Sequence, residues 1–134
     1  MSTKPSSQWN DLIQAAIQAA EYAYAPYSEY RVGAALLTVD GVVYRGCNVE
    51  NAAYGSTICA ERTAIVKAVS EGDRHFQAIA VATINGGTPC GPCRQVMREF
   101  SSNLTVIISD FAGNAHVHTL PELLPGSFGP ENLP

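Results

Sequence analysis

Two short segments of this chain are apolar over nearly their whole length, and they limit most strongly what it can fold into. They are FQAIAVATI, residues 76–84, and LTVIISD, residues 104–110. Apolar runs of this length are typical of strands buried on both faces, which occur where helices cover both sides of a sheet. Between them we expect a loop over 85–89 and a helix over 90–100. The sequence therefore predicts a sheet whose central strands are covered by helices.

Other segments supply further elements of the same fold. The predicted elements are a helix over 9–25 that Pro26 ends, a hairpin over 31–51 with its turn at Asp40-Gly41, a helix from Cys59 to a stop at Gly72, the strand, helix and strand described above, a short strand over 115–120, and a helical turn capped by Thr119 and Glu122. This order favours the α/β class, with a mixed sheet of about five strands and helices on both faces. Residues 1–134 are expected to form one domain, with residues 1–8 as a flexible tail.

Charge and hydropathy exclude some classes of partner. The formal net charge is -4 and no cluster of Lys or Arg is present, which argues against binding a nucleic acid. No apolar run approaches the ~18 residues needed to cross a bilayer, so no membrane association is expected. The first residues, MSTKPSSQW, are polar and unlike a secretory signal, which favours a cytoplasmic protein with reduced cysteines.

Three of the four cysteines have a spacing that suits a metal site. Cys90 and Cys93 form a Cys-Gly-Pro-Cys motif, which fits either a redox dithiol or half of a metal site. Cys59 lies at a second predicted helix start, so two helix N-termini can bring three thiolates together. Three protein ligands with a fourth position open are typical of catalytic zinc, whereas Cys47 as a fourth ligand would make a structural site. Glu61, two residues after Cys59, can direct a carboxylate at a bound water.

The motifs Cys59-Ala60-Glu61 and Pro89-Cys90-Gly91-Pro92-Cys93 match the signature of zinc deaminases in its three-cysteine form. Together with GCNVENAAYG, AVSEG, PCGPCRQVMREF and ELLPGSF, they make the chain resemble the small, homotetrameric, zinc-dependent cytidine deaminases over most of its length. The resemblance implies a three-layer α/β/α sandwich in which Cys59, Cys90 and Cys93 hold one zinc per chain. It also implies that Glu61 is the catalytic proton carrier.

The same resemblance implies an activity and the residues that bind the substrate. The expected reaction is hydrolytic deamination of cytidine and deoxycytidine to uridine and deoxyuridine with release of ammonia, in pyrimidine salvage. Asn48 and Glu50 are expected to bind the ribose. Two residues apart on a strand, they would face the same way, with Cys47 and Val49 on the other side. The backbone of Ala60 would meet the carbonyl of the base.

A neighbouring subunit is expected to complete the site. By the resemblance, Phe128 in a C-terminal tail over 126–134 packs on the base in the neighbour's site, and Ala52 and Tyr54 approach the sugar across that interface. Tyr30 lies where the family usually has Phe against the base, so its hydroxyl needs a partner. Ser56 stands where a larger apolar residue is common. Arg62, three residues after Cys59, is expected to donate to the sulfurs of the zinc ligands.

Two other functions are compatible with the same cysteine motifs. A related aminopyrimidine-nucleoside deaminase, such as one acting on a nucleoside antibiotic, would share the zinc chemistry, and a non-enzymatic zinc or redox module would share only the cysteines. We interpret Cys47 as a small buried apolar residue, and His116 and His118 as side chains of an ordinary exposed strand rather than metal ligands.

Overall fold

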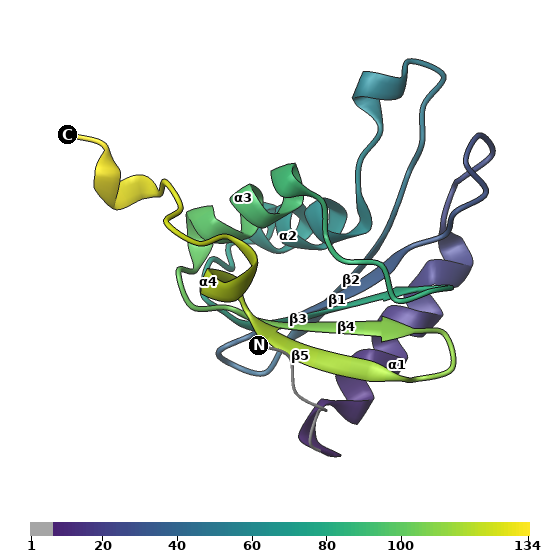
Figure 1. Cartoon of the computed structure of the whole chain (residues 1–134), viewed down its shortest axis with the longest axis horizontal. Helices are drawn as coiled ribbons and strands as arrows, with labels where there is room; N and C mark the ends of the chain where they lie inside the picture. The colour runs from purple at the N-terminus through teal and green to yellow at the C-terminus, as the bar shows by residue number, and fades with distance from the viewer. Residues whose placement is uncertain (1–6) are drawn as a thin grey trace.

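The computed structural model of the chain describes residues 7–134 (Figure 1). Residues 1–6 of the expected flexible tail lie outside the described residues, and the other two belong to a single 3-10 turn, Ser7–Trp9. No helix within the described part is long and apolar enough to cross a membrane.

A mixed five-stranded sheet forms the middle of the molecule, as the sequence predicts. Its strands are β1 Gly33–Thr38, β2 Val43–Cys47, β3 Phe76–Thr83, β4 Thr105–Asp110 and β5 Ala115–Thr119. They lie in the order β2-β1-β3-β4-β5, with β3 and β4 parallel and the other neighbours antiparallel. The two apolar segments are thus adjacent parallel strands, and the connection between them must cross one face of the sheet.

Helices cover both faces and make the expected three layers (Figure 1). Helix α1 Asn10–Ala19 lies on one face, and α2 Ala60–Ser70 and α3 Gly91–Phe100 lie on the other, with the short α4 Leu120–Leu123 after β5. Each face has its own apolar core. Leu12 and Ile13 of α1 pack against Ile107 on one side, and Ile65 of α2 and Met97 of α3 pack with Ile79 on the other.

Two glycines let the helices approach the sheet closely. A Cβ atom at Gly33 of β1 would lie 1.9 Å from the carbonyl oxygen of Ala16 in α1, and one at Gly46 of β2 would lie 2.6 Å from that of Ala60 in α2. No side chain fits at either distance. The height of α2 above the sheet, and hence of the site at its first turn, therefore depends on Gly46.

The first helix is shorter than the sequence predicts. We expected a helix over 9–25, but α1 ends at Ala19 and continues only as a 3-10 turn over Ala20–Tyr22. The reason is tertiary: Tyr24 forms a parallel bridge with Val49, and its backbone N–H donates to the carbonyl of Asn48 at 3.0 Å. Pairing with the segment after β2 takes Tyr24 out of helical geometry before Pro26 is reached.

The predicted turns and caps are present. Gly41 has a φ of 91°, the left-handed region that a tight hairpin requires, so the Asp40-Gly41 turn is confirmed. Thr119 and Glu122 form the expected capping box, in which Glu122 N–H donates to Thr119 Oγ1 at 3.4 Å.

Candidate metal centre and active site

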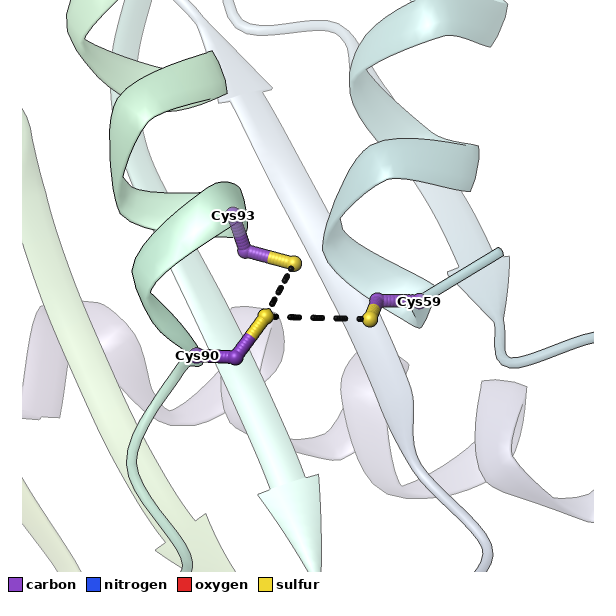
Figure 2. A group of neighbouring side chains, drawn as sticks. All are labelled: Cys59, Cys90 and Cys93. Atoms are coloured by element: carbon purple, nitrogen blue, oxygen red, sulfur yellow. Dashed lines mark hydrogen bonds between the residues drawn. The ribbon is translucent and has the colours of Figure 1, made fainter. Parts of the chain in front are cut away.

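Three cysteine sulfurs meet between the first turns of α2 and α3 (Figure 2). Cys59 directly precedes α2, Cys90 directly precedes α3, and Cys93 lies in the first turn of α3, which Pro92 favours. The sulfur of Cys90 lies 3.9 Å from that of Cys59 and 3.2 Å from that of Cys93, and all three sulfurs lie within 4.8 Å of one another. Two sulfurs on a tetrahedral zinc, with bonds of about 2.3 Å, stand about 3.8 Å apart. The cluster therefore fits a zinc ion.

Electrostatics at the cluster favour thiolate at Cys59. A hydrogen bond from Cys93 and the neighbouring Arg62 guanidinium lower the pKa of Cys59 to about 5, and the same interaction with Cys59 raises the pKa of Cys93. Arg62 Nη2 lies 3.5 Å from Cys59 Sγ, as its spacing of three residues predicts, and also 3.5 Å from the carbonyl of Thr57. Within residues 7–134, Arg62 Nε is buried without a hydrogen-bond partner. This arginine thus offers positive charge to the sulfurs.

Glu61 is a buried carboxyl beside these sulfurs. It lies in the first turn of α2 and is only 4% exposed. Burial raises its pKa to about 6, and the negative charge at Cys59 contributes to the shift. A carboxyl whose pKa lies near neutrality can both accept and return a proton, which is the property of a general acid-base group.

A cavity of about 270 Å³ joins the cluster to several of the predicted substrate residues. The predicted site residues that line it are Tyr30, Asn48, Glu50, Cys59, Glu61 and Cys90. Cys93 is buried, and so is Ala60, whose backbone N–H belongs to the first turn of α2, where helical N–H groups lack partners within the helix. Segments far apart in the chain thus converge on one cavity.

Asn48 and Glu50 face this cavity together, although they follow β2 rather than belong to it. Asn48 Nδ2 donates to the carbonyl of Tyr30 at 2.8 Å, and its Oδ1 accepts from Val32 N–H at 2.9 Å. Glu50 Oε1 accepts from the N–H groups of Tyr27 and Ser28 at 3.0 and 3.1 Å. The Ser28 hydroxyl also donates to Glu50, and these bonds hold the pKa of its carboxyl below the usual value.

The hydroxyl of Tyr30 has a hydrogen-bond partner that could not be identified from the sequence. Tyr30 Oη donates to Asn85 Oδ1 at 2.6 Å, and Thr83 Oγ1 lies 3.3 Å from the same oxygen. Sequence reasoning overlooked both Asn85 and Thr83. The available signal was their position, because they stand at the carboxyl end of a central strand, where ligands collect in open α/β sheets.

The structure does not bring every predicted residue to this cavity. Ala52, Tyr54 and Phe128 do not line it, and neither do Ala60, Arg62 and Cys93, which lie in the first turns of α2 and α3. Tyr54 lies on a segment between β2 and α2 that extends away from the sheet, at the top of Figure 1, and the C-terminal segment extends away from the sheet to the upper left. Phe128 is 56% exposed, and its carbonyl accepts from Gln95 Nε2 of α3 at 2.9 Å.

Hydrogen bonds to α3 hold this C-terminal segment in place. Arg98 Nη2 contacts the Glu131 carboxylate at 2.5 and 2.9 Å, and Arg98 Nε donates to Ser127 Oγ at 2.8 Å. The helix that carries Cys93 therefore also fixes the segment that carries Phe128.

The remaining candidate ligands lie apart from the cluster. Cys47 is half-buried rather than buried, and it lines a separate cavity with Tyr22 and Lys67. It is not among the sulfurs grouped at the metal centre, which contradicts the interpretation as a structural four-cysteine site. His116 is exposed and His118 half-buried on β5, and in the described part of the chain neither belongs to a metal-binding group.

Known proteins are similar to this chain in both sequence and fold. A family model for the cytidine and deoxycytidylate deaminase zinc-binding region matches residues 6–109. A cytidine deaminase of Sporosarcina psychrophila is 50% identical over 125 residues, which cover 91% of this chain and 92% of that protein. One from Halalkalibacterium halodurans is 53% identical over 125 residues, 91% of this chain and 95% of that protein. The crystal structure of cytidine deaminase from Burkholderia pseudomallei superposes with a TM-score of 0.86, at 48% identity, over 92% of this chain and 100% of that chain.

A helix-covered mixed sheet that carries a three-cysteine metal centre beside a buried glutamate defines the class of zinc-binding deaminase domains. Within that class, the chain belongs to the cytidine deaminase family. Its cofactor is zinc, since the matched region is the zinc-binding one and the sulfur cluster fits the ion.

Proposed function

We propose that this protein catalyses the hydrolytic deamination of cytidine and deoxycytidine to uridine and deoxyuridine, with release of ammonia, and that it serves pyrimidine salvage. The observation that carries the proposal is that the cavity beside the three cysteines also contains the buried Glu61 carboxyl. Candidate metal ligands and a carboxyl group that can carry a proton thus border the same cavity. The relatives described above are cytidine deaminases, which favours this substrate over a nucleoside antibiotic.

In this proposal Cys59, Cys90 and Cys93 hold one zinc per chain. When bound, zinc supplies a Lewis acid that makes water a competent nucleophile near neutral pH. Glu61 accepts a proton as the water oxygen attacks C4 of the base, and it delivers that proton to N3. It then carries the second water proton to the departing amine, so that water and cytidine become uridine and ammonia. The buried position of Glu61 keeps this proton transfer away from bulk water.

We assign the binding of the sugar and the base to four residues at or beside the cavity. Asn48 and Glu50 bind the ribose hydroxyls: each has already used part of its hydrogen-bonding capacity on the backbone, and the second N–H of Asn48 Nδ2 and the remaining lone pairs of Glu50 serve the sugar. Tyr30 packs against the base. The backbone of Ala60, in the first turn of α2, meets the base carbonyl.

We further propose that the single domain over residues 1–134 assembles into a homotetramer with shared active sites in the cytoplasm. Phe128, in the segment over 126–134, and Ala52 and Tyr54 then complete a neighbour's site. The exposed position of Phe128 and Tyr54 away from their own cavity supports this arrangement. The four free cysteines suit a reducing compartment.

The test is the change in ultraviolet absorbance of cytidine with the purified protein, its chelator-treated form and the variant Glu61→Gln. The variant keeps size and hydrogen bonding but cannot carry the proton, so turnover should fall by at least ~10²-fold while zinc content stays at one per chain. Glu71→Gln, an exposed glutamate just after α2, is the matched control and should retain activity. Turnover of Glu61→Gln close to that of the parent would contradict the proposed role.

A further inference from the structure

The loop over residues 84–90 forms one wall of the cavity and ends at a cysteine of the metal centre. Thr83, Gly87, Thr88 and Cys90 line the cavity from this side, and Ser28, Tyr30, Asn48 and Glu50 line it from the other. The two walls come from separate parts of the chain. The hydrogen bond from Tyr30 Oη to Asn85 Oδ1, at 2.6 Å, joins them.

This bond belongs to a short network that shapes the loop. Gly87 N–H donates to Thr83 Oγ1 at 2.8 Å, which leaves the Thr83 hydroxyl proton to donate to Asn85 Oδ1 at 3.3 Å. Asn85 Oδ1 therefore accepts from both Thr83 and Tyr30, which occupies its two lone pairs. Thr83 is buried, so its place in the network is fixed by the sheet.

The loop backbone is built to approach the Tyr30 hydroxyl. Gly86 has a φ of 70°, which favours glycine, and a Cβ atom at Gly87 would lie 2.6 Å from Tyr30 Oη. The glycines thus allow a contact that other residues would prevent. Tyr30 is also held from its own side, because Asn48 Nδ2 donates to its carbonyl.

We propose that Tyr30 is a positioning residue whose hydrogen bond to Asn85 sets the width of the nucleoside cavity. The inference rests on the proposed deamination of nucleosides at this site. The bond fixes the Tyr30 ring at one wall and the cysteine-bearing loop at the other before substrate arrives. It therefore lowers the conformational cost of binding rather than the barrier of the chemical step.

Tyr30→Phe tests this with minimal disturbance, since the ring stays and only the hydroxyl is removed. A neutral hydrogen bond corresponds to about 2- to 10-fold in affinity, so KM for cytidine and the calorimetric Kd for uridine should rise by about that factor. The value of kcat should change less than KM. Asn85→Ala should give the same increase, and the double variant should be no worse than either single one, because both changes remove one bond.

Amide hydrogen exchange of the loop gives a readout that does not depend on activity. Without nucleoside, the amides of residues 86–88 should exchange faster in Tyr30→Phe than in the parent. Tyr44→Phe is the matched control: it also removes a tyrosine hydroxyl that donates to an acidic or amide side chain, here Asp73, but it lies outside the cavity. It should leave KM, Kd and loop exchange unchanged.

The outcomes separate this inference from the proposed function. If the parent deaminates cytidine but Tyr30→Phe has the parental KM and loop exchange, or if the two single effects multiply in the double variant, the inference is wrong and the function stands. If the parent neither deaminates cytidine nor binds uridine, the proposed function is wrong, and the substrate role of Tyr30 falls with it.

Discussion

We propose that Arg62 balances charge at the metal centre. Three thiolates on a zinc dication leave a net charge of minus one, which weakens the ion as a Lewis acid. The helix N-termini at Cys59 and Cys90 oppose this, but each contributes only about 0.3–1 kcal/mol at exposed sites. The Arg62 guanidinium, 3.5 Å from Cys59 Sγ, brings a full positive charge, and its interaction with Cys59 raises its own pKa. It is therefore fully charged wherever the enzyme works.

We predict that Arg62→Gln lowers kcat and moves the onset of activity to higher pH, because the site becomes more negative and the attacking water harder to deprotonate. The pH dependence of kcat for the parent and the variant measures this. Arg74→Gln, an exposed arginine in the turn after α2, removes the same charge away from the sulfurs and should leave the profile unchanged. Superimposable profiles with equal kcat for Arg62→Gln would show that Arg62 does not tune the metal.

At the scale of single residues, the contacts that the sequence predicts best are those between residues one helical turn apart. The proximity of Arg62 to Cys59 follows from a separation of three residues on one helix turn. The partner of Tyr30 could not be predicted in the same way. Asn85 lies 55 positions away, and the contact depends on the course of a glycine-containing loop, for which sequence periodicity carries no information.

At the scale of elements, a hydrogen bond between Tyr44 and Asp73 joins β2 to the end of α2, and its contribution to stability depends on pH. The Tyr44 hydroxyl on β2 donates to the Asp73 carboxylate in the turn after α2, and this bond raises the pKa of Tyr44 from 10.0 to about 12. The protonated hydroxyl is the favoured form in the folded state. Its contribution to stability is therefore fully present below pH 10 and is lost as the pH rises from 10 to 12.

We predict that the parent loses more stability than Tyr44→Phe over this pH range, since the variant has no proton to lose at this position. Urea unfolding midpoints of both proteins on either side of pH 10 measure the difference, and the gap between them should shrink as pH rises. Tyr22→Phe, a highly exposed tyrosine, is the control for general alkaline effects. A constant gap would mean that the Tyr44–Asp73 bond does not contribute to folding.

Most of the helices and strands were predictable from the sequence, but the end of α1 was not. The strands at residues 76–84 and 104–110 were recognisable because burial on both faces requires apolar side chains throughout. The end of α1 was not, because Tyr24 leaves the helix to pair with Val49, and this long-range pairing overrides a local pattern that would allow the helix to continue to Pro26. The same pairing places Asn48 and Glu50, whose face was predicted but whose backbone partners were not.

For the whole molecule, the C-terminal segment matters most, because it is bonded to α3 and extends away from the sheet (Figure 1), and Phe128 does not line the cavity. Two residues of α3 bond to the C-terminal segment: Gln95, and Arg98, whose side chain is only 13% exposed. The Phe128 side chain nevertheless remains exposed. A segment held in this way can present an aromatic ring to another subunit at little further entropic cost. The proposed role of Phe128 therefore requires a neighbouring subunit.

We predict that Phe128→Ala weakens nucleoside binding and that co-expression with Glu61→Gln restores part of the activity. In the mixed assembly, a subunit with intact Glu61 can receive an intact Phe128 from its neighbour. The measurement is cytidine turnover of the co-expressed protein against the sum of the two variants made separately. Leu133→Ala, which truncates another exposed apolar residue of the same segment, should bind nucleoside normally. Failure of the mixture to exceed that sum would contradict a shared site.

The contact at Gly46 has a consequence for how such a protein can diversify. A side chain at this position would collide with both Ala60 and Ala64, so it would lift the whole first turn of α2, taking Cys59 and Glu61 with it. Substitution of Gly46 therefore offers no gradual route to a new active-site geometry, because even the smallest side chain displaces Cys59 and Glu61 together. Side chains that line the cavity outside this helix contact, such as Ser28 and Thr57, can change without lifting α2.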